Sequence, residues 1–65
     1  MKNLQLSLSA LRVNKGMTQQ DVADRLGVSR QTVAKWENGE SVSELVIYAL
    51  AYLYGVEIDV IRVPA

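Results

Sequence analysis

The charged side chains, with which this chain could do chemistry, are divided unevenly along it. Residues 1–36 hold six basic and two acidic residues, a net charge of +4, whereas residues 37–65 hold one basic and five acidic residues, a net charge of −4. Clustered Lys and Arg attract polyanions such as nucleic acid, although a net charge of zero argues mildly against that partner. The division therefore indicates a basic part for a polyanion and an acidic part remote from it. The basic residues of the first part are Lys2, Arg12, Lys15, Arg25, Arg30 and Lys35.

The residue types on which most catalytic and metal sites depend are missing. The sequence has neither cysteine nor histidine, which excludes disulfides, thiolate or imidazole catalysis and the usual zinc ligands. Its Asp and Glu residues stand at positions that are expected to be exposed to solvent. They form no recognisable nucleophile–base or paired-carboxylate pattern. We therefore expect a protein that is not an enzyme and that holds no metal or cofactor.

Length and composition predict one small folded domain over residues 1–65. A chain of this length is close to the lower limit for a stable hydrophobic core. Hydrophobic residues make up 49% and charged residues 22%, which excludes a disordered polar chain and favours further burial in an oligomer. The N-terminus lacks a signal-peptide pattern, and no window approaches the roughly 18 apolar residues of a membrane span. We expect a cytoplasmic protein that does not bind membranes.

The first part of the chain has the spacing of an amphipathic helix. Leu4, Leu8 and Leu11 recur four and three residues apart, and Gly16 follows. This pattern predicts a helix over residues 4–15 that ends at Gly16.

Two short helices joined by a tight turn are predicted in the middle of the chain. Thr18 with Asp21 forms a near-version of the capping box and begins the first helix, of about two turns. Gly27 ends it and suits the positive φ of the turn. Ser29 is then the N-cap of a helix over residues 30–37. The small Ala23 is expected where the two helices cross, and the residues expected to form their shared core are Val22, Leu26, Val28, Val33 and Trp36.

The last third of the chain predicts a fourth, apolar helix, followed by a tail whose secondary structure the sequence leaves undecided. Ser43 precedes an apolar run over residues 45–54, which is hydrophobic nearly all round and closes at Gly55. The tail over residues 57–63 is rich in β-branched residues and ends at Pro64. A short fifth helix and a short strand both remain open for it.

A specific set of residues carries a resemblance to a known family. These residues are Leu11-Arg12, Lys15-Gly16-Met17-Thr18-Gln19, Val22-Ala23, Leu26-Gly27-Val28-Ser29, Thr32-Val33 and Trp36-Glu37-Asn38-Gly39, with weaker matches at Leu50-Ala51, Tyr54-Gly55-Val56 and Asp59. On them the chain resembles the Cro/repressor (XRE-type) helix-turn-helix family of phage and bacterial regulators. It departs from the family pattern at Val42 and Glu44, where a proline and a leucine are common, and in its β-branched tail. The resemblance implies an all-α, lambda-repressor-like DNA-binding domain of four to five helices, with a short C-terminal strand left open.

The resemblance also implies which side chains contact DNA. In this family the second helix of the motif lies in the major groove, with its N-terminal residues at base edges. By position, the expected base contacts are Arg30, Gln31, Thr32 and Lys35, and the expected phosphate contacts are Gln19, Ser29 and Asn38. Ordinary roles stand beside these: Arg30 and Lys35 as solvated charges, Gln19 as an exposed first-turn residue and Asn38 as a helix C-cap. Glu37 is expected to bond within its own helix or to Arg12.

A dimer is expected because one such domain buries too little surface to select one genomic site. Domains of this type read half-sites roughly 34 Å apart as symmetric pairs. On the fourth helix, the residues expected to face the core are Ile47, Tyr48, Leu50, Ala51 and Tyr54. The other side then carries Val46, Ala49, Tyr52 and Leu53, which are left without an intrachain partner. The alternative is that these residues only enlarge a small core. The expected interface is Val46, Ala49, Tyr52, Leu53, Ile58, Val60, Ile61 and Val63.

The sequence thus predicts a sequence-specific regulator of transcription that binds double-stranded DNA. A Cro-like repressor that binds a palindromic operator as a homodimer, with no small-molecule ligand, fits it best. A small protein-interaction module, or an antitoxin-type regulator whose main partner is another protein, is the alternative. Salt dependence separates them, because only DNA binding must weaken steeply as salt rises. Phage, restriction-controller, antitoxin and chromosomal roles remain equally open.

Overall fold

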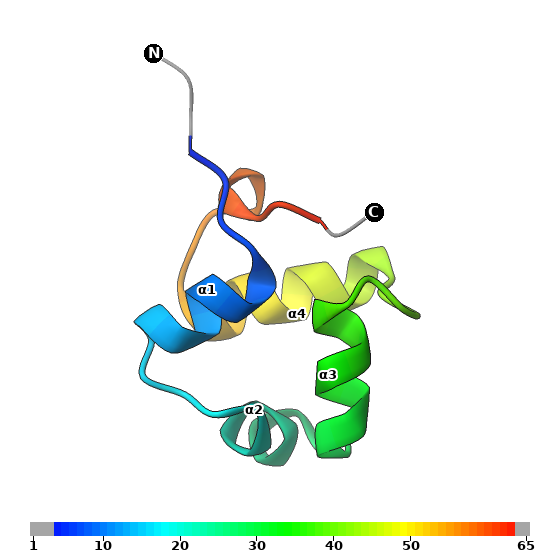
Figure 1. Ribbon diagram of the computed structural model, residues 1–65. Coiled ribbons are helices and arrows are strands. Elements are labelled where there is room, and N and C mark those ends of the chain that lie inside the picture. Colours follow the sequence, from blue (N-terminus) through cyan, green and yellow to red (C-terminus); the bar gives the residue numbers. More distant parts are fainter. Residues whose placement is uncertain (1–3, 64–65) are drawn as a thin grey trace.

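The computed structural model describes residues 4–63, so Lys2 and Pro64 lie outside the described residues. Its elements are α1 (Leu8–Asn14), α2 (Gln19–Leu26), α3 (Arg30–Glu37), α4 (Glu44–Tyr54) and the 3-10 turn η1 (Ile58–Val60) (Figure 1). Over residues 4–63 no β-sheet forms, which confirms the all-α class.

Each of the four α-helices begins at a hydroxyl side chain. Ser7, Thr18, Ser29 and Ser43 are extended in backbone, and each accepts a hydrogen bond from the backbone N–H three residues later. Such caps satisfy donors that would otherwise lack partners in the first turn of a helix. At Thr18 the cap is a full capping box, because the Asp21 carboxylate accepts from the Thr18 N–H in return. The three caps predicted at Thr18, Ser29 and Ser43 are confirmed.

The tight turn between α2 and α3 depends on a left-handed residue. Gly27 has φ +71° and ψ 34°, and its N–H donates to the carbonyl of Ala23. Without a Cβ, glycine adopts this conformation without a steric penalty. The predicted boundaries of α2 and α3 are therefore confirmed at this turn.

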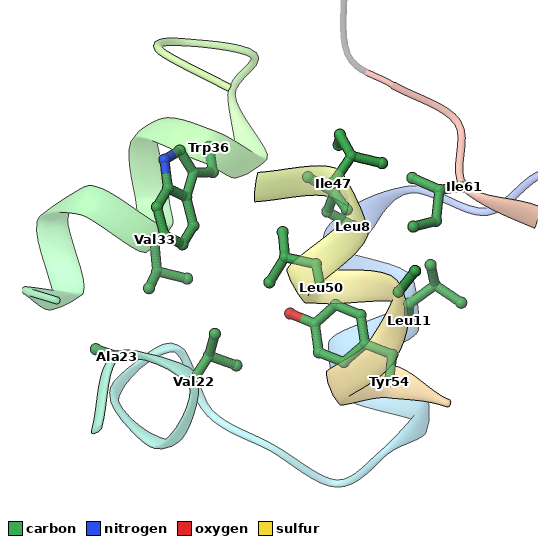
Figure 2. Close-up of a cluster of buried hydrophobic side chains, with 11 residues drawn as sticks. Leu8, Leu11, Val22, Ala23, Val33, Trp36, Ile47, Leu50, Tyr54 and Ile61 are labelled. Atoms are coloured by element: carbon green, nitrogen blue, oxygen red, sulfur yellow. The ribbon is translucent and has the colours of Figure 1, made fainter. Parts of the chain in front are cut away.

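One cluster of apolar side chains holds the helices together. In Figure 2, Leu50 and Tyr54 of α4 face Val22 of α2 and Val33 of α3. Trp36 lies about one turn beyond Val33 along α3, farther from the α2–α3 turn. Leu26 and Val28, predicted for the same core, are half-buried and pack against it. The buried members are Leu8, Leu11, Val22, Ala23, Val33, Trp36, Ile47, Leu50, Ala51, Tyr54 and Ile61.

The first helix starts later than predicted. Leu4 is 83% exposed and lies outside α1, which begins at Leu8 after its cap Ser7. Leu6 instead pairs with the tail: its N–H donates to Val60 O and its carbonyl accepts from the N–H of Arg62, both at 2.8 Å. The extended pairing and the Ser7 cap together outweigh the leucine spacing that extended the predicted helix to Leu4.

The tail combines the two forms that the sequence left open. Residues 58–60 form η1, and Ile61 then makes an isolated parallel bridge with Leu6. Ile61 is 3% exposed and belongs to the core of its own chain. The tail therefore closes the domain beside the N-terminal segment (Figure 1).

Candidate nucleic-acid interface

The exposed side of α3 brings together three of the predicted base-contact residues. Arg30, Gln31 and Lys35 are exposed, whereas Val33 and Trp36 on the same helix are buried. At about 100° per residue the three exposed side chains fall within an arc of about 140°, opposite the buried pair. The arc presents two cations and one amide, groups that can pair with guanine and adenine edges. Ala34, half-buried, lies within the same arc and was missed by sequence reasoning.

The hydroxyl groups at the start of α3 are engaged with each other. Ser29 Oγ accepts from the backbone N–H of Thr32 at 3.1 Å and lies 2.9 Å from Thr32 Oγ1. The predicted base contact Thr32 therefore has its hydroxyl in the helix cap. Its methyl group is the part left for a base, and Ser29 retains limited hydrogen-bonding capacity for a phosphate.

A carboxylate from the end of α3 holds the start of α2. Gln19 is half-buried, and its Nε2 donates to Glu37 Oε1 at 2.9 Å. A side-chain amide has two N–H donors, so one is held by Glu37 and the other can donate elsewhere. The predicted phosphate residue Gln19 is thus not a freely solvated side chain, and its amide is oriented by α3.

The same carboxylate pairs with α1. Arg12 Nε donates to Glu37 Oε2 at 2.7 Å, and Arg12 Nη1 donates to Met17 O at 2.9 Å. The two side chains of the ion pair are only 15% and 9% exposed. The expected contact between Glu37 and Arg12 is therefore confirmed, and one carboxylate joins α1, α2 and α3. Sequence reasoning missed its bond to Gln19, because residues 18 apart show no local spacing signal.

This ion pair changes how the charges are distributed. Arg12 belongs to the basic first part of the sequence, but Glu37 neutralises it beneath the surface. The exposed cations of that part, among the described residues, are Lys15, Arg25, Arg30 and Lys35. Asp21 and Asp24 on α2 are also exposed, so the basic surface is concentrated on α3 and the ends of α1 and α2.

A buried tyrosine lies in the field of the same ion pair. Tyr54 is 4% exposed, and its pKa rises to about 12 from the ordinary 10.0. Burial is the main cause, the negative charge of Glu37 adds to it, and Arg12 opposes it. The phenol therefore stays neutral in the folded protein at any physiological pH.

Asn38 follows the last residue of α3 and caps the C-terminal end of this helix. It is the C-cap residue, with φ −90° and ψ 2°, and Gly39 follows with φ +84°. Its side chain is exposed. The C-cap role is confirmed, and a phosphate contact by the same residue stays a prediction.

The predicted dimer residues divide into two groups. Ala49, Tyr52, Ile58 and Val63 are exposed, whereas Val46, Leu53 and Val60 are half-buried against the core and Ile61 is fully buried. The expectation that Val46 and Leu53 lack intrachain partners is therefore wrong, as is the expectation that Tyr48 faces the core, since it is 58% exposed. Because α4 is apolar nearly all round, sequence spacing alone misplaced its boundary between core and surface.

Neither a metal-binding cluster nor a membrane-spanning helix is found in the part of the chain that the structure describes. Residues 4–63 contain no cluster of three Asp or Glu side chains that could hold a metal ion. None of the described helices is long and apolar enough to cross a membrane.

Comparison with known proteins agrees with this geometry. The model of a family described as helix-turn-helix matches residues 8–61, which is most of the chain. No curated protein and no solved structure is significantly similar to this chain.

Proposed function

Because the chain belongs to the XRE-type helix-turn-helix family of DNA-binding transcription regulators, we propose that it is a Cro-like repressor that binds a palindromic operator as a homodimer. The exposed arc of Arg30, Gln31 and Lys35 on α3 is the observation that supports this most. Repression then follows from occupancy, because a domain seated on the operator excludes polymerase from the same duplex.

In this proposal α3 enters the major groove and reads base edges. Arg30 and Lys35 donate to guanine O6 and N7, and Gln31 pairs with adenine N6 and N7. The Thr32 methyl group adds an apolar contact to a thymine methyl. The buried Val33 and Trp36 fix the rotation of α3, so that the reading arc always faces away from the core.

The phosphate contacts set where α3 lies along the duplex. Gln19 and the free N–H groups at the start of α2 bind one phosphate, and Ser29 and Asn38 contact the backbone at the two ends of α3. Since Glu37 holds the Gln19 amide at 2.9 Å, the anchor and the reading helix are rigidly connected. A fixed anchor loses little conformational entropy when DNA binds.

The experiment that tests this proposal is selection of bound sequences from a pool of random duplexes. A palindrome with half-site centres about 34 Å apart is expected, because two copies read successive turns of one face of the duplex. The double variant Arg30→Ala/Lys35→Ala is the control and should enrich nothing. A single half-site without symmetry would contradict the homodimer, and no enrichment by the native chain would contradict sequence-specific binding.

The exposed apolar face of α4 favours one second candidate, a domain whose main partner is another protein, as in an antitoxin-type regulator. Leu45 and Tyr52 are 81% and 91% exposed, which is unusual for a face that meets only water. Salt separates the two functions. DNA binding should weaken steeply as salt rises from 50 to about 200 mM, whereas an apolar protein contact should not.

A further inference from the structure

One face of α4 is apolar and uncovered. Leu45, Tyr48, Ala49 and Tyr52 are all exposed, and they follow one another at the spacing i, i+3, i+4 and i+7. This spacing places them in one line along the helix. We call these four residues the α4 stripe.

The α4 stripe differs from the exposed faces of α2 and α3, the two helices of the motif. Ten successive residues, 45–54, carry no charge, and the only charged residue of α4 is Glu44 at its first position. The exposed faces of α2 and α3 carry Asp24, Arg25, Arg30 and Lys35 instead. A face in permanent contact with water normally has charges at this spacing, so the α4 stripe has the composition of a covered surface.

A groove lies beside the N-terminal half of the stripe. Its volume is about 340 Å³, and Tyr48 of the stripe forms part of its wall. Ile58 and Val63 of the tail, 40% and 53% exposed, form another part. The full lining is Val42, Ser43, Glu44, Ile47, Tyr48, Ile58 and Val63.

We infer that a second copy of this chain covers the α4 stripe in an antiparallel α4–α4 pair, with Tyr52 of each copy seated in the groove of the other. This inference rests on the homodimer of the proposed function and specifies its interface. A twofold axis beside residues 48 and 49 sets position 52 of one copy opposite position 45 of its partner. The most exposed aromatic ring of the chain then meets the hollow at the start of the partner's helix.

Two features select this occupant. The stripe is complementary to itself about its centre: the small Ala49 of one copy lies opposite Tyr48 of the other, and Tyr52 lies opposite Leu45, so that the helices can approach within about 8–10 Å. Isologous pairing requires such self-complementarity. In area, covering a whole tyrosine buries about 150–250 Å², so Tyr52, 91% exposed, contributes nearly that much and Tyr48, 58% exposed, somewhat more than half of it. Together with Leu45, Ala49, Ile58 and Val63 they supply a large part of the roughly 800 Å² per partner of a standard interface.

The pairing also leaves the DNA-binding arc free. The end of α3 that carries Arg30 and Gln31 lies beside α2, and its other end leads through residues 38–43 into α4 (Figure 1). A partner bound along α4 therefore leaves Arg30 and Gln31 uncovered, because they lie at the end of α3 that is remote from α4.

Disulfide trapping tests the orientation directly, because the native chain has no cysteine. A single Ala49→Cys variant should oxidise to a disulfide-linked dimer, since residues beside an antiparallel axis face their own copies. The control is Val13→Cys on α1, at a position 62% exposed, which should remain monomeric on a non-reducing gel. Equal, slow cross-linking of both variants would overturn the pairing.

Sedimentation of charge variants tests the surface itself. Tyr52→Glu should raise the dimer dissociation constant about 30-fold or more, as loss of a central aromatic anchor does. The matched control Val13→Glu should leave it unchanged. Because both side chains are largely exposed, neither change should disturb the monomer fold, which circular dichroism checks. A dimer that withstands Tyr52→Glu, or a native chain that is monomeric at tens of micromolar, would overturn the inference.

The two proposals can fail separately. Suppose that the native chain dimerises through Ala49 but enriches no duplex: the interface then stands and the DNA-binding proposal falls. If it selects a palindrome while Tyr52→Glu stays dimeric, the regulator stands and the α4 stripe is not its interface.

Discussion

Single side chains at the proposed DNA-binding surface fall into two kinds with different expected effects. Gln31 is exposed on α3, whereas Gln19 is half-buried and held by Glu37. Base contacts discriminate between sequences, and phosphate contacts only position the protein. The same residue type at two positions should therefore affect binding in two different ways.

Gln31→Ala should relax the preference at one base pair in each half-site. The expected loss on the best operator is about 1–3 kcal/mol, with little loss on operators already changed at that position. Gln19→Ala should instead weaken binding to all of them alike. Titration of both variants against a panel of single-base operator variants measures this, and equal losses on every duplex for both variants would show that Gln31 reads no base.

Glu37 is expected to act on both stability and binding, since its carboxylate contacts Arg12 and Gln19. Glu37→Gln leaves Arg12, which is only 15% exposed, without its counter-charge and should lower the free energy of unfolding by about 2 kcal/mol. It should also weaken all operators alike, because the Gln19 amide loses its orientation. Urea denaturation measures the first effect, with the exposed Asp24→Asn as control. If Glu37→Gln were as stable as that control, the ion pair would contribute nothing to folding.

Tyr54 should make the domain sensitive to alkaline pH. Its pKa is raised to about 12 in the folded state and is near 10.0 in the unfolded chain. A raised folded pKa contributes stability that is complete below pH 10 and is lost as pH rises through 12, about 2 to 3 kcal/mol in all. Thermal unfolding between pH 9 and about 12 measures the loss. Tyr54→Phe should flatten this part of the pH profile, whereas Tyr52→Phe, at an exposed position, should keep it.

At the level of elements, the turn between α2 and α3 is the most sharply specified feature. Gly27 has φ +71°, and a Cβ added there would meet no atom within 4 Å. Gly27→Ala should therefore lower stability by about 1 kcal/mol through backbone strain alone, without a clash. Gly27→Asn should cost less, because asparagine tolerates the left-handed region. Chemical denaturation compares the two, and an alanine variant as stable as the native chain would mean that the turn relaxes to negative φ.

The elements predicted well from sequence are those with caps at both ends. Thr18 and Gly27 bound α2, and Ser29 and Asn38 bound α3, because local hydrogen bonds and one positive φ determine these boundaries. Local sequence signals of this kind do not reveal which distant segments of the chain pair with each other. The start of α1 was misplaced because Leu6 pairs with the tail some 54 residues later, as the Leu6–Val60 hydrogen bond shows.

The candidate site was predicted to a similar extent. The exposure of Arg30, Gln31 and Lys35 follows from helical spacing within α3, once Val33 and Trp36 are assigned to the core. The α4 surface did not follow, because a helix that is apolar on every side carries no polar face to mark its outside. Helical spacing assigns Tyr48 inward and Val46 outward, whereas in the structure Tyr48 is exposed and Val46 packs against the core.

For the whole molecule, neutrality of charge is compatible with binding to a polyanion because the charges are segregated. The charges of Arg12 and Glu37 cancel beneath the surface, and the exposed Arg30 and Lys35 lie on α3, the proposed reading helix. Exposed Glu44, Glu57 and Asp59 belong to α4 and the tail, on which the second copy is proposed to lie. Affinity for DNA then depends on the density of exposed cations on the protein surface that contacts each half-site. It also depends on how many half-sites one protein oligomer binds.

Salt dependence measures that number. The logarithm of the binding constant should fall with the logarithm of salt concentration by about 0.9 for each phosphate neutralised. The native dimer on a full palindrome neutralises two equal sets of phosphates, whereas the monomeric Tyr52→Glu variant on a duplex with one half-site neutralises one set. The slope for the native dimer should therefore be about twice that of the variant, and Val13→Glu should keep the larger slope. Equal slopes for the native chain and Tyr52→Glu would mean that only one copy contacts DNA at a time, which would contradict the twofold complex even if the protein dimerises in solution.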